Sequence, residues 1–175
     1  MKRFVGVVFI LIAISAGAFA QAPIFDSTPV VTGEYGVSYI YNIEASDPDE
    51  DPIEILLSSG PLPSGLSFTD NGSGSATISG TPSETGDFPL TLTVQEIADN
   101  SSFDTQSYTL SISKTAATVT LSNLSHIYDG TPKSADATTN PPGLTVDITY
   151  DGSATSPTNA GDYSVTAVIN DSNYQ

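Results

Sequence analysis

Apolar and polar residues alternate with a period of two along several short segments of the chain. The apolar set of residues 37–46 consists of Val37, Tyr39, Tyr41, Ile43 and Ala45. Residues 88–95 and 108–113 repeat the alternation. A period of two predicts strands that bury one face in a core. Apolar residues spaced by three and four over a helix length do not occur, and the frequent Thr, Ser, Gly and Pro disfavour helices. We therefore expect an all-β protein.

Glycine and proline mark the bends between the strands expected in the first half. The run Leu62 to Phe68 is followed by Ile78 to Pro82 and by Gly86 to Phe88. Short strands with turn signals about every 8 to 12 residues are typical of an Ig-like β-sandwich. In this order, the three runs resemble the signature of putative-Ig and dystroglycan-type cadherin-like modules of bacterial surface proteins. The resemblance covers residues 22–113 and implies a fold more specifically than a function.

A new strand pattern begins after residues 114–116. Residues 117–121 and 145–150 alternate, and the Asp-Gly steps at residues 129–130 and 151–152 favour tight turns with positive backbone φ. This half resembles the bacterial MBG, or YDG-type, surface repeat in residues 127–133, 148–152, 159–163 and 173–175. Such repeats continue past the last of these pieces with one more strand. The resemblance thus implies a second module that lacks its last strand, in a chain that is a fragment of a longer protein.

The expected architecture is a pair of tandem Ig-like/cadherin-like β-sandwich modules, with residues 21–114 as the first and 115–175 as the second. A short internal sequence repeat supports this modular construction. Gly86-Asp87-Phe88 recurs as Gly161-Asp162-Tyr163, 75 residues later. We expect a local role for both copies: the glycine turns the chain into a strand, the acid faces solvent or caps the turn, and the aromatic ring seals the edge of the core.

The N-terminus predicts export. Lys2 and Arg3 precede an apolar run from Phe4 to Ile14, and Ala18-Phe19-Ala20 has the small-x-small form of a cleavage site. Residues 1–20 therefore read as a signal peptide, with Gln21 as the first residue of a secreted or cell-surface protein. The alternative is a membrane anchor, but the apolar run is shorter than the roughly 20 residues that a span needs.

The net charge limits the classes of partner that the chain can bind. Beyond residue 20 the chain has two basic residues against twenty acidic ones, a net charge of −18. Such a surface repels nucleic acid and anionic lipid and attracts divalent cations. The chain contains no cysteine, so disulfides cannot stabilise its modules.

Catalysis finds little support in the sequence. The only histidine, His126, stands beside Ile127 and Tyr128 at an expected strand position, where a half-buried structural role is the favoured interpretation. Motifs for a nucleophilic elbow, a zinc protease or a phosphate loop do not occur. Tyr39, Tyr41 and Tyr108 could stack on sugars if they were exposed, but their alternation places them in the core. We expect a protein that is not an enzyme.

One acidic cluster suggests a metal. Asp47-Pro48-Asp49-Glu50-Asp51-Pro52 follows an expected strand, and alternate aspartates in a rigid loop suit the hard oxygen ligands of Ca²⁺. The loop resembles the A-x-D-P-D-x-D-P loop of cadherin-like domains, which implies Asp47, Asp49 and Asp51 as calcium ligands, with Asp99 as a further acid near the end of the penultimate strand. It departs from that loop at Glu50, where a glycine often stands. The alternative is a solvated acidic loop without a metal.

Together these features predict an adhesion or spacer segment of an exported cell-surface protein, stabilised by calcium. The alternative is a non-catalytic accessory segment of a large secreted hydrolase. The expected partners are calcium, an unidentified cell-surface protein or glycan, and further modules of the same polypeptide. Nucleic acid and a membrane span are not expected.

Overall fold

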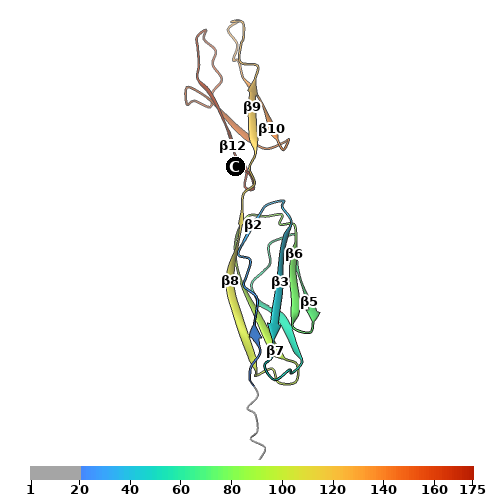
Figure 1. Ribbon diagram of the computed structural model, residues 1–175. Coiled ribbons are helices and arrows are strands. Elements are labelled where there is room, and N and C mark those ends of the chain that lie inside the picture. Colours follow the sequence, from blue (N-terminus) through green and yellow to red (C-terminus); the bar gives the residue numbers. More distant parts are fainter. Residues whose placement is uncertain (1–20) are drawn as a thin grey trace, which may run out of the picture.

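The computed structural model describes residues 21–175, so the signal peptide expected at residues 1–20 lies outside the described part. Every regular element in the described part is a strand, as the alternation predicts. None of these residues forms a helix with the length and apolarity that a membrane crossing requires. The strands form two modules placed end to end (Figure 1): the first module holds eight strands and the second module four.

The first module is a sandwich of two four-stranded sheets. Its strands are β1 (Ile24–Phe25), β2 (Thr32–Glu34), β3 (Tyr39–Ser46), β4 (Ile53–Ser59), β5 (Leu66–Gly72), β6 (Ser75–Gly80), β7 (Gly86–Glu96) and β8 (Phe103–Ser113). One sheet has the order β1-β3-β6-β5 and the other the order β2-β8-β7-β4. All pairs are antiparallel except β2 with β8, which is parallel.

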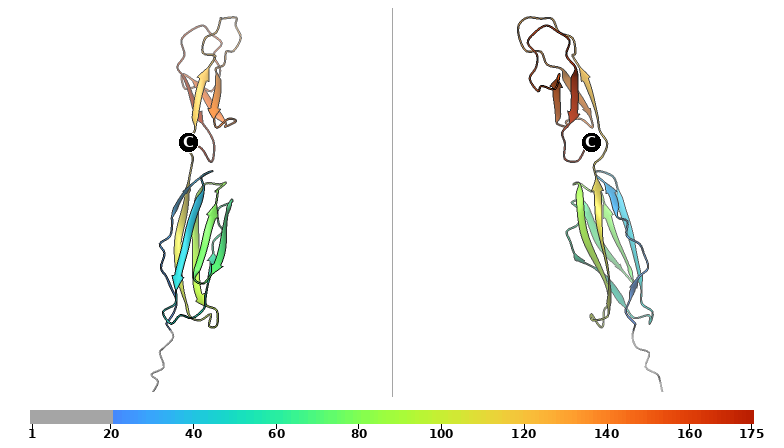
Figure 2. Two further views of the ribbon diagram at one scale, coloured as in Figure 1. Left: turned by 45° about the vertical axis from the view of Figure 1, so that its right-hand side comes forward. Right: turned by 90° about the vertical axis from the view of Figure 1, so that its left-hand side faces the viewer.

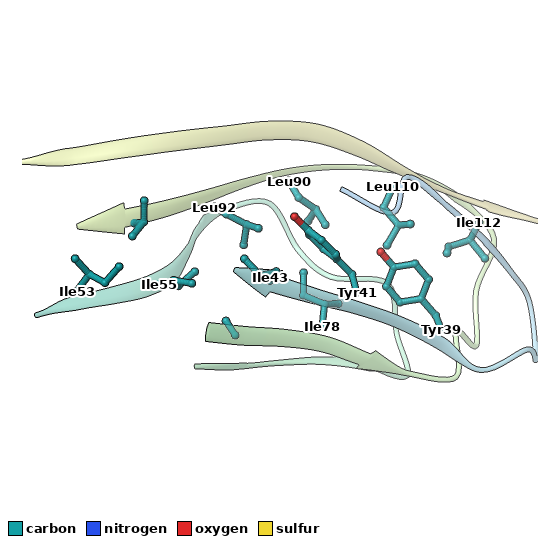
Figure 3. Packing of buried hydrophobic residues seen from close by; sticks show 12 residues of the cluster. Tyr39, Tyr41, Ile43, Ile53, Ile55, Ile78, Leu90, Leu92, Leu110 and Ile112 are labelled. Atoms are coloured by element: carbon teal, nitrogen blue, oxygen red, sulfur yellow. The ribbon is translucent and has the colours of Figure 1, made fainter. Parts of the chain in front are cut away.

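The core of the first module lies between these two sheets (Figure 3). Along β3, Tyr39, Tyr41 and Ile43 are buried while the residues between them are exposed. The same alternation buries Leu90, Leu92 and Val94 on β7, because successive side chains of a strand point to opposite faces. The predicted inward positions are confirmed except for Val37. This residue is 46% exposed and precedes β3, since the chain is still turning at Gly36, whose φ is 73°.

The two glycine-containing runs that carry the family resemblance meet in space. Gly65 and Gly80 both have positive φ, at 89° and 142°. A Cβ on Gly65 would collide with the Thr81 carbonyl, and one on Gly80 with the Gly65 carbonyl. The amides of Thr81 and Ser83 donate to the carbonyls of Gly65 and Ser64, at 3.1 and 2.8 Å. The pattern therefore records one close backbone contact at the ends of β5 and β6, which only glycine permits.

The second module has less of a core. Its strands are β9 (Thr118–Ser122), β10 (Asp136–Asn140), β11 (Val146–Tyr150) and β12 (Val165–Ile169), paired β9 with β10 and β11 with β12. Among its hydrophobic residues only Ala135 and Tyr150 are buried, whereas inward residues such as Val119 and Ile169 stay half-buried. A groove of 390 Å³ opens into the module. Apolar surface that a complete sandwich would bury is thus accessible here.

His126 does not have the half-buried strand position that the sequence suggested. It is exposed and lies in the irregular segment after β9, beside Ile127, which is 89% exposed. The structural reason is the turn chemistry that follows: Asp129 accepts hydrogen bonds from the Thr131 amide and hydroxyl, at 2.9 and 2.6 Å, so the chain forms a loop where alternation alone favoured a strand.

The repeated Gly-Asp-aromatic motif has the local role expected of it. Gly86 begins β7, Asp87 accepts a hydrogen bond of 2.6 Å from the Ser111 hydroxyl, and Phe88 packs against the core. In the second module Tyr163 is half-buried just before β12, and its hydroxyl donates to the Asn159 carbonyl at 3.2 Å.

Three tyrosines lie within or against the core of the first module. The Tyr39 hydroxyl donates to the Val30 carbonyl at 2.6 Å, and that of Tyr41 donates to Gln106 at 2.8 Å. Tyr108 packs edge-on to Tyr41, with ring centroids 6.1 Å apart, and its hydroxyl is buried without a hydrogen-bond partner in the described chain. Burial raises the pKa of Tyr39 to about 12, with Tyr41 adding to the effect. Burial likewise raises the pKa values of Tyr41 and Tyr108.

These shifts predict the alkaline limit of stability. A raised pKa in the folded state means that the neutral phenol is favoured by folding, so its contribution is complete below the ordinary value of 10.0 and is lost as the pH rises through about 12. We expect the free energy of unfolding, from urea titrations at a series of pH values, to fall steeply between these limits. Tyr39→Phe should flatten that fall and lower stability near neutrality by about 1 kcal/mol, the worth of the lost hydrogen bond. A wild-type profile that stays level to pH 12 would contradict this.

Candidate functional site

The acidic loop between β3 and β4 is folded around Asp47. One carboxylate oxygen of Asp47, Oδ1, accepts hydrogen bonds from the backbone amides of Asp49 and Asp51, at 2.9 and 3.1 Å. The Asp47 carbonyl also accepts from the Glu50 amide at 3.2 Å. These bonds need a short acceptor side chain at the first position, which explains an aspartate there. Asp47 therefore organises the backbone of the loop as well as contributing charge.

The second oxygen of this carboxylate is the unusual atom. Oδ2 of Asp47 is buried, yet it has no hydrogen-bond partner in the described part of the chain. Buried polar atoms nearly always have a hydrogen-bond partner, so we expect this carboxylate oxygen to bind a further ligand, either water or an ion. This oxygen is the atom of the loop at which a water molecule or a cation would bind.

Asp99 lies on a different loop at the same end of the module. Its Oδ1 accepts from the Ser101 amide and hydroxyl, at 3.0 and 2.6 Å, and these hydrogen bonds lower the pKa of Asp99. The Ile97 amide donates to the Pro52 carbonyl at 2.9 Å, which ties this loop to the end of the acidic loop. The structure therefore places all four acids that the sequence named as candidate ligands at one end of the sandwich.

The four carboxylates are not assembled into a ligand cage. Over residues 21–175, no group of three or more His, Cys, Asp or Glu side chains has an arrangement that could hold a metal ion. Asp49, Asp51 and Asp99 are exposed, and Asp49 Oδ2 accepts instead from the Gln21 amide at 2.6 Å. The structure brings together the backbone of Asp47, Asp49 and Asp51 but leaves their side chains apart.

Sequence reasoning passed over one buried acid at this end. Glu96, the last residue of β7, is only 5% exposed and accepts a hydrogen bond from the Ser102 hydroxyl. Its position in the alternation with Leu92 and Val94 would have identified it, because a carboxylate on the inward face of a strand needs a partner.

The opposite end of the first module forms the junction with the second module. Tyr35 packs edge-on against Tyr174, with ring centroids 5.3 Å apart and planes at 75°. The Thr115 hydroxyl donates to the Tyr35 carbonyl, and the Thr85 hydroxyl donates to the Ser172 carbonyl at 3.2 Å. The Lys114 ammonium reaches the Asp171 carbonyl at 2.6 Å. The sequence placed the module boundary at residues 114–116, but it did not predict these contacts, because each of them joins positions far apart in the chain.

The chain was compared with known families, curated proteins and solved structures. A family model described as "Putative Ig domain" matches residues 22–113. The chain belongs to this family. A model described as "MBG domain" matches residues 117–175, and the two-module arrangement expected from the motifs is confirmed. We call the first module the Ig module and the second the MBG module. Such domains are typically non-catalytic and typical of extracellular or surface proteins, and they indicate an accessory or adhesion-type protein.

Several solved structures resemble the chain in part. An endo-fucoidan hydrolase of glycoside hydrolase family 107 is 23% identical, with a TM-score of 0.41 over 53% of this chain and 14% of its own. A putative α-galactosidase/melibiase of Bacteroides fragilis is 24% identical, with a TM-score of 0.39 over 54% of this chain and 18% of its own. The titin domains z1z2 in complex with telethonin are 16% identical, with a TM-score of 0.43 over 78% of this chain and 72% of theirs. The chain thus spans less than a fifth of the two hydrolases. No curated protein matches it.

The acidic loop carries a testable backbone strain at Glu50. This residue has a φ of 63°, a left-handed conformation that costs a residue with a Cβ about 1 kcal/mol and that glycine adopts readily. Glu50→Gly should therefore raise the free energy of unfolding by up to about 1 kcal/mol. Glu50→Gln is the matched control, since it removes the same charge and keeps the Cβ. Equal gains from both variants would mean that charge repulsion, and not backbone strain, limits the loop.

Proposed function

We propose that the chain is a spacer or adhesion segment of an exported surface protein, in which two β modules hold other parts of the protein at a fixed distance. The observation that carries this proposal is the junction. Its aromatic contact and its hydrogen bonds join the two modules end to end, and the views of Figure 2 agree on an elongated arrangement. A segment that sets a distance needs such stiffness, whereas an accessory domain on a flexible tether does not.

The bonding at the junction leaves little room for a hinge. β8 ends at Ser113 and β9 begins at Thr118, so only four residues connect the modules. Thr115 is held on both sides, because it bonds the Ig module through its hydroxyl and the MBG module through its backbone, and Lys114 reaches the MBG module through its ammonium group. A linker whose residues are bonded to both modules transmits orientation from one to the other.

Removing the aromatic contact should loosen the junction. An edge-on aromatic pair contributes about 0.5–1.5 kcal/mol beyond its buried area, so Tyr174→Ala should broaden the distribution of inter-module angles and shorten the mean end-to-end distance. Small-angle X-ray scattering measures both. Tyr128→Ala serves as the control, because Tyr128 is 65% exposed and lies outside the junction. A scattering curve unchanged by Tyr174→Ala would show that the contact does not set the geometry.

Export is part of the proposal. Cleavage after Ala20 would expose an amino group at Gln21, the residue whose nitrogen lies 2.6 Å from Asp49 Oδ2. We expect intact-mass or N-terminal sequencing of the secreted product to find Gln21 first, or its cyclised pyroglutamate form. A product that retains Met1 would contradict both the cleavage and the proposed location.

An exchange experiment tests the spacer role itself. Residues 21–175 are replaced, within the native surface protein, by an unrelated pair of Ig modules of the same length, and in a second strain by a Gly/Ser linker of equal residue number. A spacer predicts that surface function survives the first exchange and fails in the second, because flexible linkers do not hold a distance. Failure of both would indicate specific adhesion by this chain. Survival of both would reject a structural role.

We also propose that a further strand completes the MBG module. The half-buried inward residues of β9 and β12 support this, because an additional strand would cover apolar surface that is now open. Further modules of the same polypeptide are the partners that an end-to-end array would place next to it.

Calcium at the acidic loop is the last part of the proposal. The buried Oδ2 of Asp47 supports a cation there, and Asp49 and Asp51, whose side chains are exposed on the same loop, would be its further ligands. Asp99 would contribute from the neighbouring loop. The ion would supply charge neutralisation at the end of the Ig module farthest from the junction, where like charges are crowded.

If calcium binds the folded loop, it must stabilise the protein. At a concentration about one hundred times the dissociation constant the gain is roughly 2.7 kcal/mol, which raises the melting temperature of a small domain by about 10 °C or more. Affinity should lie around 10⁻⁴ to 10⁻³ M, the range of extracellular modules. Calorimetric melts in calcium, and in sodium and magnesium at equal ionic strength, measure the specific part.

Matched variants separate calcium binding at the acidic loop from general screening of the negative surface charge. Asp47→Asn should abolish the calcium-specific rise, whereas Asp136→Asn removes one exposed charge from the MBG module and should leave it intact. Equal melting temperatures in calcium and in sodium of matched ionic strength, for the wild-type protein, would show that the cluster is a solvated acidic loop that does not bind calcium.

A further inference from the structure

The register of β1 brings the first residue of the Ig module to the acidic loop. Ile24 stands opposite Ser46 in an antiparallel pair. Each step back along one strand of such a pair is a step forward along the other, so the same register continued by three residues places Gln21 opposite Asp49. Pro23, the residue just before β1, is fully buried and anchors the segment.

The contact that this register predicts is present in the structure. The backbone nitrogen of Gln21 donates a hydrogen bond of 2.6 Å to Oδ2 of Asp49. The Asp49 amide donates in turn to Oδ1 of Asp47 at 2.9 Å, which holds the backbone that carries the acceptor. Pairing within the sheet and hydrogen bonding within the loop thus bring this nitrogen and this carboxylate together.

The Ig module has no side chain that carries a positive charge. Residues 21–113 include fourteen acidic side chains and not one Lys, Arg or His. Six of the acids lie between Glu44 and Glu54, in β3, the acidic loop and β4. Like charges this close repel one another, so a positive group among them lowers the free energy of the folded state.

We propose that cleavage after Ala20 supplies this positive group, and that the acidic loop is the binding site of the new amino terminus. Before cleavage the Gln21 nitrogen belongs to a neutral amide, and afterwards it belongs to an ammonium group. A hydrogen bond between charged groups is roughly twice as strong as a neutral one. Removal of the signal peptide therefore stabilises the Ig module. The inference rests on the proposed export, because the ammonium group exists only in a processed chain.

Two chemical forms of the same chain separate the charge from the rest of the contact. One form is residues 21–175 with a free amino group, prepared by a protease that leaves Gln21 first. The other is this protein after treatment with a glutaminyl cyclase. In that reaction the Gln21 nitrogen forms a bond to its own side-chain Cδ, and the side-chain nitrogen leaves as ammonia. The product keeps one N–H on the same nitrogen but loses the positive charge.

The free-amine form should be the more stable one. For an exposed ion pair we expect a shift of the unfolding equilibrium of up to about fivefold, and a melting temperature higher by up to about 5 °C. Calorimetric melts of the two forms measure the difference, in a chelator so that calcium does not occupy Asp49. Equal melting temperatures of the two forms would overturn the inference.

Substitutions in the loop show whether Asp49 carries the effect. Asp49→Asn keeps the size of the side chain and removes its charge, so the difference between the two forms should disappear in this variant. Glu50→Gln is the matched control, because it removes one exposed charge from the same loop and leaves the Gln21 contact in place. A difference that persists in Asp49→Asn would show that the amino group does not bind this carboxylate.

A second measurement follows the chemistry of Gln21 without the enzyme. The nitrogen must leave Asp49 before it attacks its own side chain, so the contact slows spontaneous cyclisation. Intact mass over time should show the loss of ammonia up to about fivefold faster in Asp49→Asn than in the wild type, with Glu50→Gln at the wild-type rate. Equal rates in all three proteins would contradict the contact.

The outcomes distinguish this inference from the export on which it rests. The melts and the cyclisation rates use purified protein, so a negative result there overturns the inference and leaves export standing. A secreted product that retains Met1 overturns the export itself, and with it the processing that creates the ammonium group.

Discussion

The continuity of β8 into the junction is the constraint on which the rest of the structure depends. This strand holds β7 on one side and β2 on the other, and only four residues later the chain enters β9. Its inward residues Leu110 and Ile112 lie in the core. The linker therefore begins from a backbone that cannot move without disturbing that core. β8 thus fixes the point at which the linker leaves the first module, and the tyrosine pair and hydroxyl contacts hold the second module against that end.

The two modules reach stability by unequal means. In the Ig module, residues such as Ile43, Leu92 and Leu110 are fully buried, which at about 25 cal/mol per Å² of apolar surface is the dominant favourable contribution to folding. The MBG module has two small sheets whose apolar faces stay partly open, and no disulfide compensates because the chain has no cysteine. Its contacts with the linker and with Tyr35 then matter more to it than to its neighbour. We infer that the Ig module acts as the folded base on which the MBG module is ordered.

The sequence predicted the features that local periodicity controls and missed those that depend on distant parts of the chain. The strands β3, β7 and β8 and their inward residues follow from a period of two, and the glycine-containing runs identified the family before any geometry was known. Val37 and His126 were misplaced because alternation does not register that the chain is turning at Gly36 or at Asp129. For the acidic loop, the sequence identified the acids as candidate ligands. It did not predict that one carboxylate oxygen of Asp47 accepts backbone hydrogen bonds while the other has no partner in the described chain. The boundary between the modules was predicted at residues 114–116, but the contacts of the junction were missed, because Tyr35 and Tyr174 lie 139 residues apart in the chain.

Charge sets the conditions under which such an array stays extended. With two basic residues against twenty acidic ones beyond residue 20, attraction between opposite charges cannot hold the modules together. The one ion pair within the described residues, Lys133 with Asp129 at 2.6 Å, is local to a loop of the second module. Like charges on neighbouring modules repel over a Debye length of roughly 8 Å at physiological salt. That repulsion opposes folding back of one module onto the other, while the uncharged contacts at the junction, an aromatic pair and hydroxyl-to-carbonyl bonds, are insensitive to salt. Electrostatics at long range thus favours an extended arrangement, which the tyrosine pair, the hydroxyl bonds and the Lys114 ammonium bond hold at short range.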